Sequence, residues 1–201
     1  MIDNADIVEL GEIINPNMFL EFVEEADKLE IVIHKYGQSL VNYNFPYWIQ
    51  YNNEGNTQGT ISFTRNTYSH PILRKMVDMI IEKLVPFFPK ETPPNPLRVH
   101  LVKTTGSLPI HKDENGRTTC INIGLKNSSG AITKISTDGH YGMMLVNSKS
   151  IVVQDGYGYL MNTNQWHSVT STNNFDRYLI TYSFDTTFSD TIKFLQISEN
   201  K

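Results

Sequence analysis

Hydrophobic and polar residues follow different patterns in the two halves of the chain. Between residues 18 and 29, and again between residues 72 and 85, apolar side chains recur every three or four positions. This spacing predicts two amphipathic helices, each with an apolar face for packing on the outside of a sheet. Asn15-Pro16 and His70-Pro71 precede these segments, and proline is favoured in the first turn of a helix.

From residue 97 onward the pattern changes to short β-branched and aromatic runs separated by Gly, Asn, Asp and Ser, which predicts strands. The expected strands span 97–104, 108–113, 117–125, 131–136, 143–146, 150–154, 158–162, 167–171 and 177–184, with others at 7–14 and near 31–36 and 61–65. Many short strands at this spacing are typical of a sandwich or a closed barrel. Residues 191–197 are expected to add a short strand or helix.

Composition and charge narrow the class of protein. The 201 residues, 39% of them hydrophobic, suit one domain or one domain with an extension. Seventeen basic and 21 acidic residues leave a net charge of −4, which argues against nonspecific nucleic-acid binding. No run approaches the ~18 apolar residues of a membrane span, and the first residues lack a signal-peptide pattern. Cys120 is the single cysteine, so we expect a reducing, cytoplasmic location.

The residue types around 108–113 and 167 point to a metal site. His111 and Asp113 are separated by one residue, so in an extended segment their side chains point to the same face. His167 begins another β-rich run 54 residues after Asp113. Two imidazoles and one carboxylate on one side of an ion leave its other positions open, an arrangement associated with non-haem Fe(II) oxygenases. We therefore predict His111, Asp113 and His167 as the metal ligands and the catalytic centre.

A zinc site is the main rival interpretation. Asp138-Gly139-His140-Tyr141-Gly142 is a glycine-flanked segment between strands, and His140 could join His111 and His167 on zinc. That site would leave Asp113 and Arg177 without roles.

Arg177 stands at the start of an apolar strand, ten residues after His167. An arginine at a strand end can simply face solvent. Alternatively, its planar guanidinium can hold a carboxylate through two parallel hydrogen bonds, which suits an anchor for an acidic cosubstrate.

With these residues in order, the segment 97–185 resembles the 2-oxoglutarate- and Fe(II)-dependent oxygenases, whose pattern is His-x-Asp, a distal His and an Arg about ten residues beyond it. It also resembles the aspartyl/asparaginyl β-hydroxylase-like branch, through Asp155-Gly156 and the His-to-Arg spacing. The resemblance implies a mainly β fold, a double-stranded β-helix (jelly roll, cupin-like), here with two supporting N-terminal helices. The expected organisation is a single domain, 1–201, with a support region at 1–96, the β-helix core at 97–185 and a C-terminal tail at 186–201.

The resemblance also implies chemistry. The cofactors would be Fe(II), 2-oxoglutarate and O2, and the reaction would hydroxylate a C–H bond of a protein side chain or small molecule, with release of succinate and CO2. Arg177 would bind the distal carboxylate of 2-oxoglutarate. The family often places a Ser or Thr two residues after this Arg, but here that position is Leu179.

Several polar residues are candidates for assisting Arg177. Thr181 and Ser183 share its face in a regular strand, whereas Asn122 and His100 interrupt apolar strands. Asn122 and His100 are explained equally well as hydrogen-bonded groups near a strand edge. Two rival functions remain at this point: a metal-binding jelly roll that acts as a sensor or binding module, and a zinc-dependent enzyme.

Overall fold

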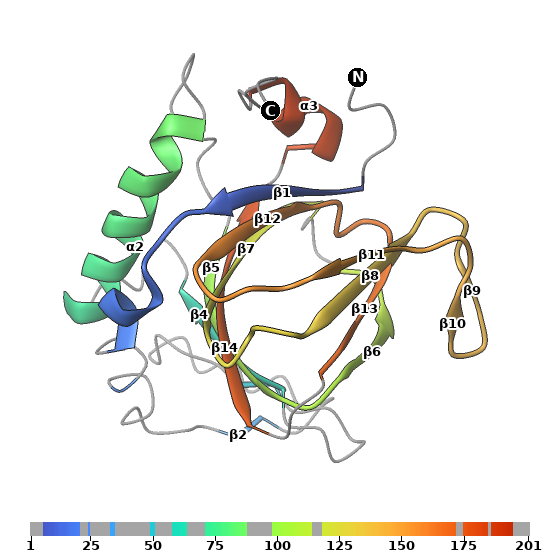
Figure 1. Ribbon diagram of the computed structural model, residues 1–201, viewed down its shortest axis with the longest axis horizontal. Helices are drawn as coiled ribbons and strands as arrows, with labels where there is room; N and C mark the ends of the chain where they lie inside the picture. Colours follow the sequence, from blue (N-terminus) through green and yellow to red (C-terminus); the bar gives the residue numbers. More distant parts are fainter. Residues whose placement is uncertain are drawn as a thin grey trace.

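Two antiparallel sheets face each other and form a flattened barrel in the computed structural model (Figure 1). The structure describes residues 6–20, 24, 33–34, 49–50, 58–63, 71–87, 98–113, 118–171, 175–184 and 186–194. The two sheets contain strands of eight residues or fewer, with one exception of nine, as the turn-rich sequence predicts.

The major sheet has six strands in the order β1-β12-β7-β14-β5-β4. Their bounds are β1 Ile7–Glu12, β12 Tyr157–Met161, β7 Thr119–Lys126, β14 Asp176–Phe184, β5 Arg98–Thr105 and β4 Gln58–Phe63. All neighbours are antiparallel, and β5 pairs with β14 over the whole length of β5, from Asp176↔Thr105 to Ser183↔Arg98. β7 and β14 are the two central strands of the sheet.

The minor sheet has four strands in the order β11-β8-β13-β6. They are β11 Lys149–Val152, β8 Ile132–Ser136, β13 Trp166–Thr170 and β6 Leu108–His111. A hairpin of β9 (His140–Tyr141) and β10 (Met144–Leu145) follows β8 and projects from the barrel (Figure 1). A separate parallel pair joins β2 (Ile33–His34) to β3 (Ile49–Gln50).

The apolar core lies on the outer face of the major sheet. Along β14, Tyr178, Ile180, Tyr182 and Phe184 belong to this core, whereas the alternate residues face the barrel interior. Helix α2 (Pro71–Leu84) contributes Met76, Ile80 and Leu84 from a single face, and the three are fully buried. Figure 1 shows α2 beside the major sheet and away from the minor one. The short elements η1 (Pro16–Phe19) and α3 (Phe188–Phe194) add Phe19 and Phe188, and η2 (Val85–Phe87) continues from α2.

The predicted fold class is confirmed: the protein is mainly β, with the two facing sheets of a jelly roll and supporting helices. Asn15 caps η1 through its side chain, as the Asn-Pro pair predicts, and most of the helix expected to follow it lies outside the described residues. The C-terminal segment forms the helix α3. The strand predicted at 143–146 is present as β10, and a turn at 142–143 pairs it with β9, which was not predicted. The division at residues 96 and 97 stays a prediction, since 88–97 are not described.

Among the described residues, no helix is both long and apolar enough to span a membrane.

Candidate metal centre

His111 and His167 are brought side by side by the pairing of two strands in the minor sheet. His111 is the last residue of β6, His167 is the second residue of β13, and the two are directly paired. Paired residues of an antiparallel ladder project to the same face, so both imidazoles point into the barrel. Their ring centroids are 4.2 Å apart.

Asp113 joins these histidines from outside the strand. We expected residues 108–113 to be extended throughout, but β6 ends at His111, and Asp113 lies two residues beyond it. The backbone N–H of Asp113 donates a 3.0 Å hydrogen bond to the carbonyl of Thr163, which fixes the chain just after the strand. Its carboxylate thereby reaches the space between the two rings.

The three potential ligand atoms converge on one point. Asp113 Oδ1 is 3.8 Å from His111 Nε2 and 3.9 Å from His167 Nε2. One donor atom from each residue lies within 4.8 Å of the others, and no other described group of three or more His, Cys, Asp or Glu side chains is arranged in this way. Two atoms bound at ~2.1 Å to the same metal ion are separated by at most ~4.2 Å. The observed Asp–His separations meet this condition.

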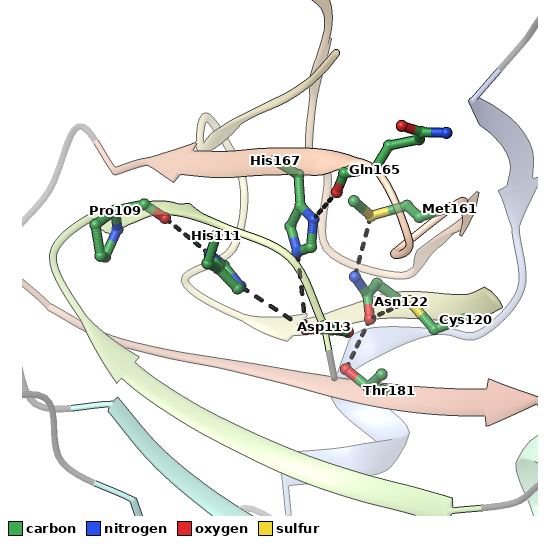
Figure 2. Close-up of polar contacts among 9 residues, drawn as sticks. All are labelled: Pro109, His111, Asp113, Cys120, Asn122, Met161, Gln165, His167 and Thr181. Carbon is green, nitrogen blue, oxygen red and sulfur yellow. Dashed lines mark hydrogen bonds and ion pairs between the residues drawn. The ribbon is translucent and has the colours of Figure 1, made fainter. Parts of the chain in front are cut away.

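Hydrogen bonds to the backbone orient both imidazoles (Figure 2). His111 Nδ1 is 2.8 Å from the carbonyl of Pro109, and His167 Nδ1 is 2.9 Å from the carbonyl of Gln165. A carbonyl only accepts, so each Nδ1 carries a proton, and in the neutral ring Nε2 keeps its lone pair. The lone pairs face Asp113. Such bonds on the far nitrogen are the usual means of setting the tautomer of a metal-binding histidine.

The site is open on one side and buried on the other. The His111 side chain is 35% exposed, whereas those of Asp113 and His167 are 13% and 7% exposed. Two neutral imidazole nitrogens and one carboxylate oxygen are the donor set of the facial triad that suits Fe(II). The chemistry and arrangement of the donors therefore fit a divalent transition metal with free positions on its far side.

A pocket between the two sheets leads inward from these three residues. It is lined by Val102, Leu108, His111, Asp113, Cys120, Asn122, Gly124, Ser128, Thr133, Val153, Tyr159, Met161, Thr163, His167, Val169, Arg177, Leu179 and Thr181. Strand registers order these residues by depth. Thr181 pairs with Asn122, and Arg177 lies four residues before Thr181 on β14, roughly 13 Å along the strand. The pocket thus extends from the three ligands to Arg177.

Arg177 faces the pocket and is buried, with 2% of its surface exposed. The alternative of a solvent-facing arginine at a strand end is therefore excluded by its position. Desolvation lowers the pKa of Arg177 to about 10, so the side chain still carries its charge at neutral pH. A buried cation at the inner part of a pocket favours an anionic group of a ligand.

Asn122 forms the centre of a small polar network on the pocket wall (Figure 2). Its Oδ1 accepts a 2.7 Å hydrogen bond from the Thr181 hydroxyl and a longer one, 3.6 Å, from Cys120 Sγ. Its Nδ2 donates to the sulfur of Met161 at 3.2 Å. A thioether is a weak acceptor, so this amide N–H remains able to turn toward a stronger acceptor in the pocket.

The other predicted residues have different positions. His100 pairs in register with Thr181, but its side chain is outside the described part of the structure. Ser183 is fully buried next to the paired Cys120, and it is not among the residues that line the pocket. His140 is exposed on the hairpin, where its ring packs edge-on against Trp166 at 4.3 Å. It does not belong to the cluster of His111, Asp113 and His167.

Sequence reasoning missed several pocket residues, among them Thr133, Met161 and Tyr159. Thr133 and Ile135 are buried on β8 whereas Lys134 between them is exposed, and this alternation is visible in the sequence as an inward-facing threonine. What the sequence does not show is that β8 lies opposite the strand that carries Arg177.

Comparisons with known proteins give a result for the fold only. No family model matches the sequence, and no curated protein matches it. Among solved structures, HygX from Streptomyces hygroscopicus, with nickel and 2-oxoglutarate bound, has a TM-score of 0.55 at 11% identity, covering 90% of this chain and 83% of that one. An oxidoreductase of the 2OG-Fe(II) oxygenase family from Burkholderia pseudomallei has a TM-score of 0.57 at 11% identity, covering 90% and 85%. The epimerase SnoN from nogalamycin biosynthesis, described as non-haem and α-ketoglutarate-dependent, has a TM-score of 0.54 at 10% identity, covering 90% and 79%.

Proposed function

We propose that this protein is a 2-oxoglutarate- and Fe(II)-dependent dioxygenase. The observation that carries the proposal is the convergence of His111, Asp113 and His167, with both imidazole Nε2 atoms directed toward one carboxylate oxygen. The similarity of fold supports the proposal. HygX is described with 2-oxoglutarate bound, SnoN as α-ketoglutarate-dependent, and the Burkholderia protein as a member of the 2OG-Fe(II) oxygenase family. The metal would supply O2 activation and oxidation of a C–H bond, with release of succinate and CO2.

The residues of the chain have distinct tasks in this proposal. His111, Asp113 and His167 would hold the iron, and the backbone carbonyls of Pro109 and Gln165 would keep the two rings in place. Arg177, deep in the pocket, would bind the distal carboxylate of 2-oxoglutarate through its guanidinium fork. The cosubstrate would then lie along the pocket wall that contains Asn122 and Thr181.

The burial of the pocket has a chemical consequence. Arg177 is almost fully covered, so the inner end of the pocket is shielded from bulk water. Exclusion of water strengthens the attraction between a guanidinium and a carboxylate and protects reactive species from side reactions. The partly exposed side, at His111, is where the primary substrate would approach.

The primary substrate is the least constrained part of the proposal. HygX is described with hygromycin B bound and SnoN with nogalamycin RO, so proteins of this fold accept small molecules. We propose a small molecule as the substrate and retain a protein side chain as the alternative. Assignment to the aspartyl/asparaginyl β-hydroxylase-like branch rests on the sequence alone. Asp155, one of the residues used for that likeness, has a structural role here: its carboxylate accepts a hydrogen bond from the backbone N–H of Ser128.

The proposal is tested with the purified full chain under anaerobic conditions. Addition of 2-oxoglutarate to the Fe(II)-loaded protein should produce a metal-to-ligand absorption band, and admission of O2 should release succinate even without a primary substrate. A protein that binds metal but shows neither signal would be a sensor or binding module. Activity that requires zinc and does not require 2-oxoglutarate would indicate a zinc-dependent enzyme. Either outcome would refute the proposed oxygenase function.

A further inference from the structure

The β9–β10 hairpin carries large apolar side chains that the rest of the chain does not cover. Met143 and Tyr141 are 89% and 81% exposed, the two highest values among the large apolar side chains of the described residues, and Met144 is 69% exposed. Figure 1 shows the hairpin projecting from the barrel, on the side away from the major sheet. We call Tyr141, Met143 and Met144 the hairpin tip. A contiguous apolar patch that faces water is typical of an interaction surface.

The sequence of the hairpin lacks charged residues. Between Asp138 and Lys149 there is no Asp, Glu, Lys or Arg. Exposed strands that stay single usually carry charged side chains, which prevent association with another chain. The hairpin tip has no such protection.

The base of the hairpin is held in place, so the tip has a defined position. The ring of His140 packs edge-on against Trp166, with the centroids 4.3 Å apart. The backbone N–H of Val146 donates to the carbonyl of Gly139 at 3.0 Å, and the Ser136 hydroxyl donates to the carbonyl of Val146. A surface that is ordered before it binds loses less conformational entropy on binding.

The tip is large enough for a weak dimer. A side chain of this size presents roughly 200 Å² when it is fully exposed, so the three residues leave on the order of 500 Å² in water. Two such surfaces in contact would remove ~1,000 Å² from water, which is the lower limit for a specific protein–protein interface. Interfaces of standard size range from picomolar to micromolar affinity, so this smaller one should dissociate at micromolar concentrations or above.

The absence of charge also makes the tip complementary to itself. In a twofold-symmetric dimer the same surface of both copies is in contact, and residues near the axis meet their own equivalents. A charged residue there would face a like charge and be repelled. Met143 and Met144 avoid this repulsion, and their flexible side chains adapt to a neighbouring apolar surface.

We propose that the hairpin tip is a self-association surface, through which two copies of this chain form a weak twofold-symmetric dimer. Tyr141, Met143 and Met144 of each copy would lie at the centre of the contact. The inference uses no residue of the metal site, so it does not depend on the proposed function.

The first test measures the mass of the full chain by sedimentation equilibrium at increasing concentration. The wild-type protein should pass from monomer to dimer and go no further, because a twofold contact closes on itself. Met144→Glu should raise the dimer dissociation constant by about 10-fold or more, because two like charges are brought together. Phe175→Glu is the matched control. Phe175 is 69% exposed, like Met144, but lies outside the hairpin, so this variant should dimerise as the wild type does.

Chemical cross-linking tests which surface is in contact. Cys120 is the single cysteine and is 1% exposed, so Met143→Cys places the accessible thiol of the chain on the tip. A short bismaleimide should join two Met143→Cys chains in high yield. Phe175→Cys, treated at the same concentration, should give only the low yield of random collisions.

Thermal unfolding at a concentration where the protein is monomeric checks that each variant keeps the wild-type fold. If Met144→Glu does not fold, Met144→Ser is measured against the same criteria. Four results would each overturn the inference: a wild-type protein that stays monomeric, association that continues beyond the dimer, equal dimerisation of wild type and Met144→Glu, or equal cross-linking at residues 143 and 175.

Discussion

The two sheets of the barrel carry different halves of the site and are buried to different degrees. All three metal-ligand candidates come from the minor sheet and the residues just after β6, and His111 there is partly exposed. Arg177, Asn122 and Thr181 come from the major sheet, whose other face is covered by the apolar core and α2 (Figure 1). The metal side is near solvent, whereas the side that would bind the carboxylate is built into the scaffold.

This difference has a physical reason. The backbone at Arg177 is paired with Thr104 of β5, and the pairing of β14 with β7 begins at the next residue, Tyr178, so the buried cation stands on a well-supported strand. Metal ligands need an open side for the substrate, and the partly exposed His111 at the end of β6 provides it. Substitutions in the minor sheet should therefore change metal binding more than stability, and those in the major sheet should change both.

The largest effect is expected at the metal ligands. His167→Ala, Asp113→Ala or His111→Ala removes one of three donors and should weaken metal binding by ~100-fold or more, since loss of even a supporting contact costs 10- to 100-fold. Binding of Mn(II) or anaerobic Fe(II) is followed by calorimetry. His140→Ala is the control and should keep wild-type affinity, because His140 packs on Trp166 outside the cluster. An equal loss in His140→Ala would favour the zinc site.

Arg177→Ala should have the next largest effect, on the cosubstrate and not on the metal. Loss of a buried charge-assisted pair costs on the order of 2–5 kcal/mol, or roughly 30- to several-thousand-fold in 2-oxoglutarate affinity. Arg177→Lys should recover only part of it, since an ammonium lacks the planar fork. Titration of 2-oxoglutarate into the anaerobic Fe(II) protein measures both. Unchanged 2-oxoglutarate affinity in Arg177→Ala would show that Arg177 does not bind the cosubstrate.

Gly156→Ala tests the claim that the major sheet is the scaffold. Gly156 has φ +85°, and a Cβ there would lie 2.5 Å from the carbonyl oxygen of Ile14. The strain of a left-handed residue costs about 1–2 kcal/mol, and the backbone clash adds to it. Gly11, also at φ +85° but with nothing within 4 Å of its Cβ position, is the matched control. Chemical denaturation should show a clearly larger loss for Gly156→Ala than for Gly11→Ala; similar losses would show that the contact relaxes freely.

The Asn122 network should contribute a smaller amount. Asn122→Leu leaves the buried Thr181 hydroxyl without its acceptor and should cost about 1–3 kcal/mol of unfolding free energy. Adding Thr181→Val should recover part of that loss, because both polar partners are then gone. Urea denaturation of the two single variants and the double variant measures this coupling. Strictly additive losses would mean that the two side chains do not depend on each other.

The smallest effect is expected on the β9–β10 hairpin, which follows β8 of the minor sheet. Met143 and Met144 are 89% and 69% exposed, so Met143→Ser and Met144→Ser should change stability by no more than ~0.5 kcal/mol. Metal affinity should also be unchanged. A marked drop in Tm would show that the hairpin packs against the barrel and that the minor sheet is less open than its surface indicates.

The sequence by itself determined the local structure and the chemical candidates. The β-branched and aromatic runs, bounded by Gly, Asn, Asp and Ser, place the strands from β5 to β14 within a residue or two of the predicted ones, apart from β9, because turn residues mark where each strand ends. The sequence also contains the types and order of His111, Asp113, His167 and Arg177, and the chemistry of a ligand set depends on residue types.

Only the tertiary structure decided which of these residues meet. Alternation tells which face a residue is on, but the partner strand and its register depend on contacts between distant segments. The pairing of β6 with β13 places His111 beside His167, and the end of β6 leaves Asp113 on the following loop. His140 lies outside the cluster, because the turn after β8 directs the hairpin away from the barrel.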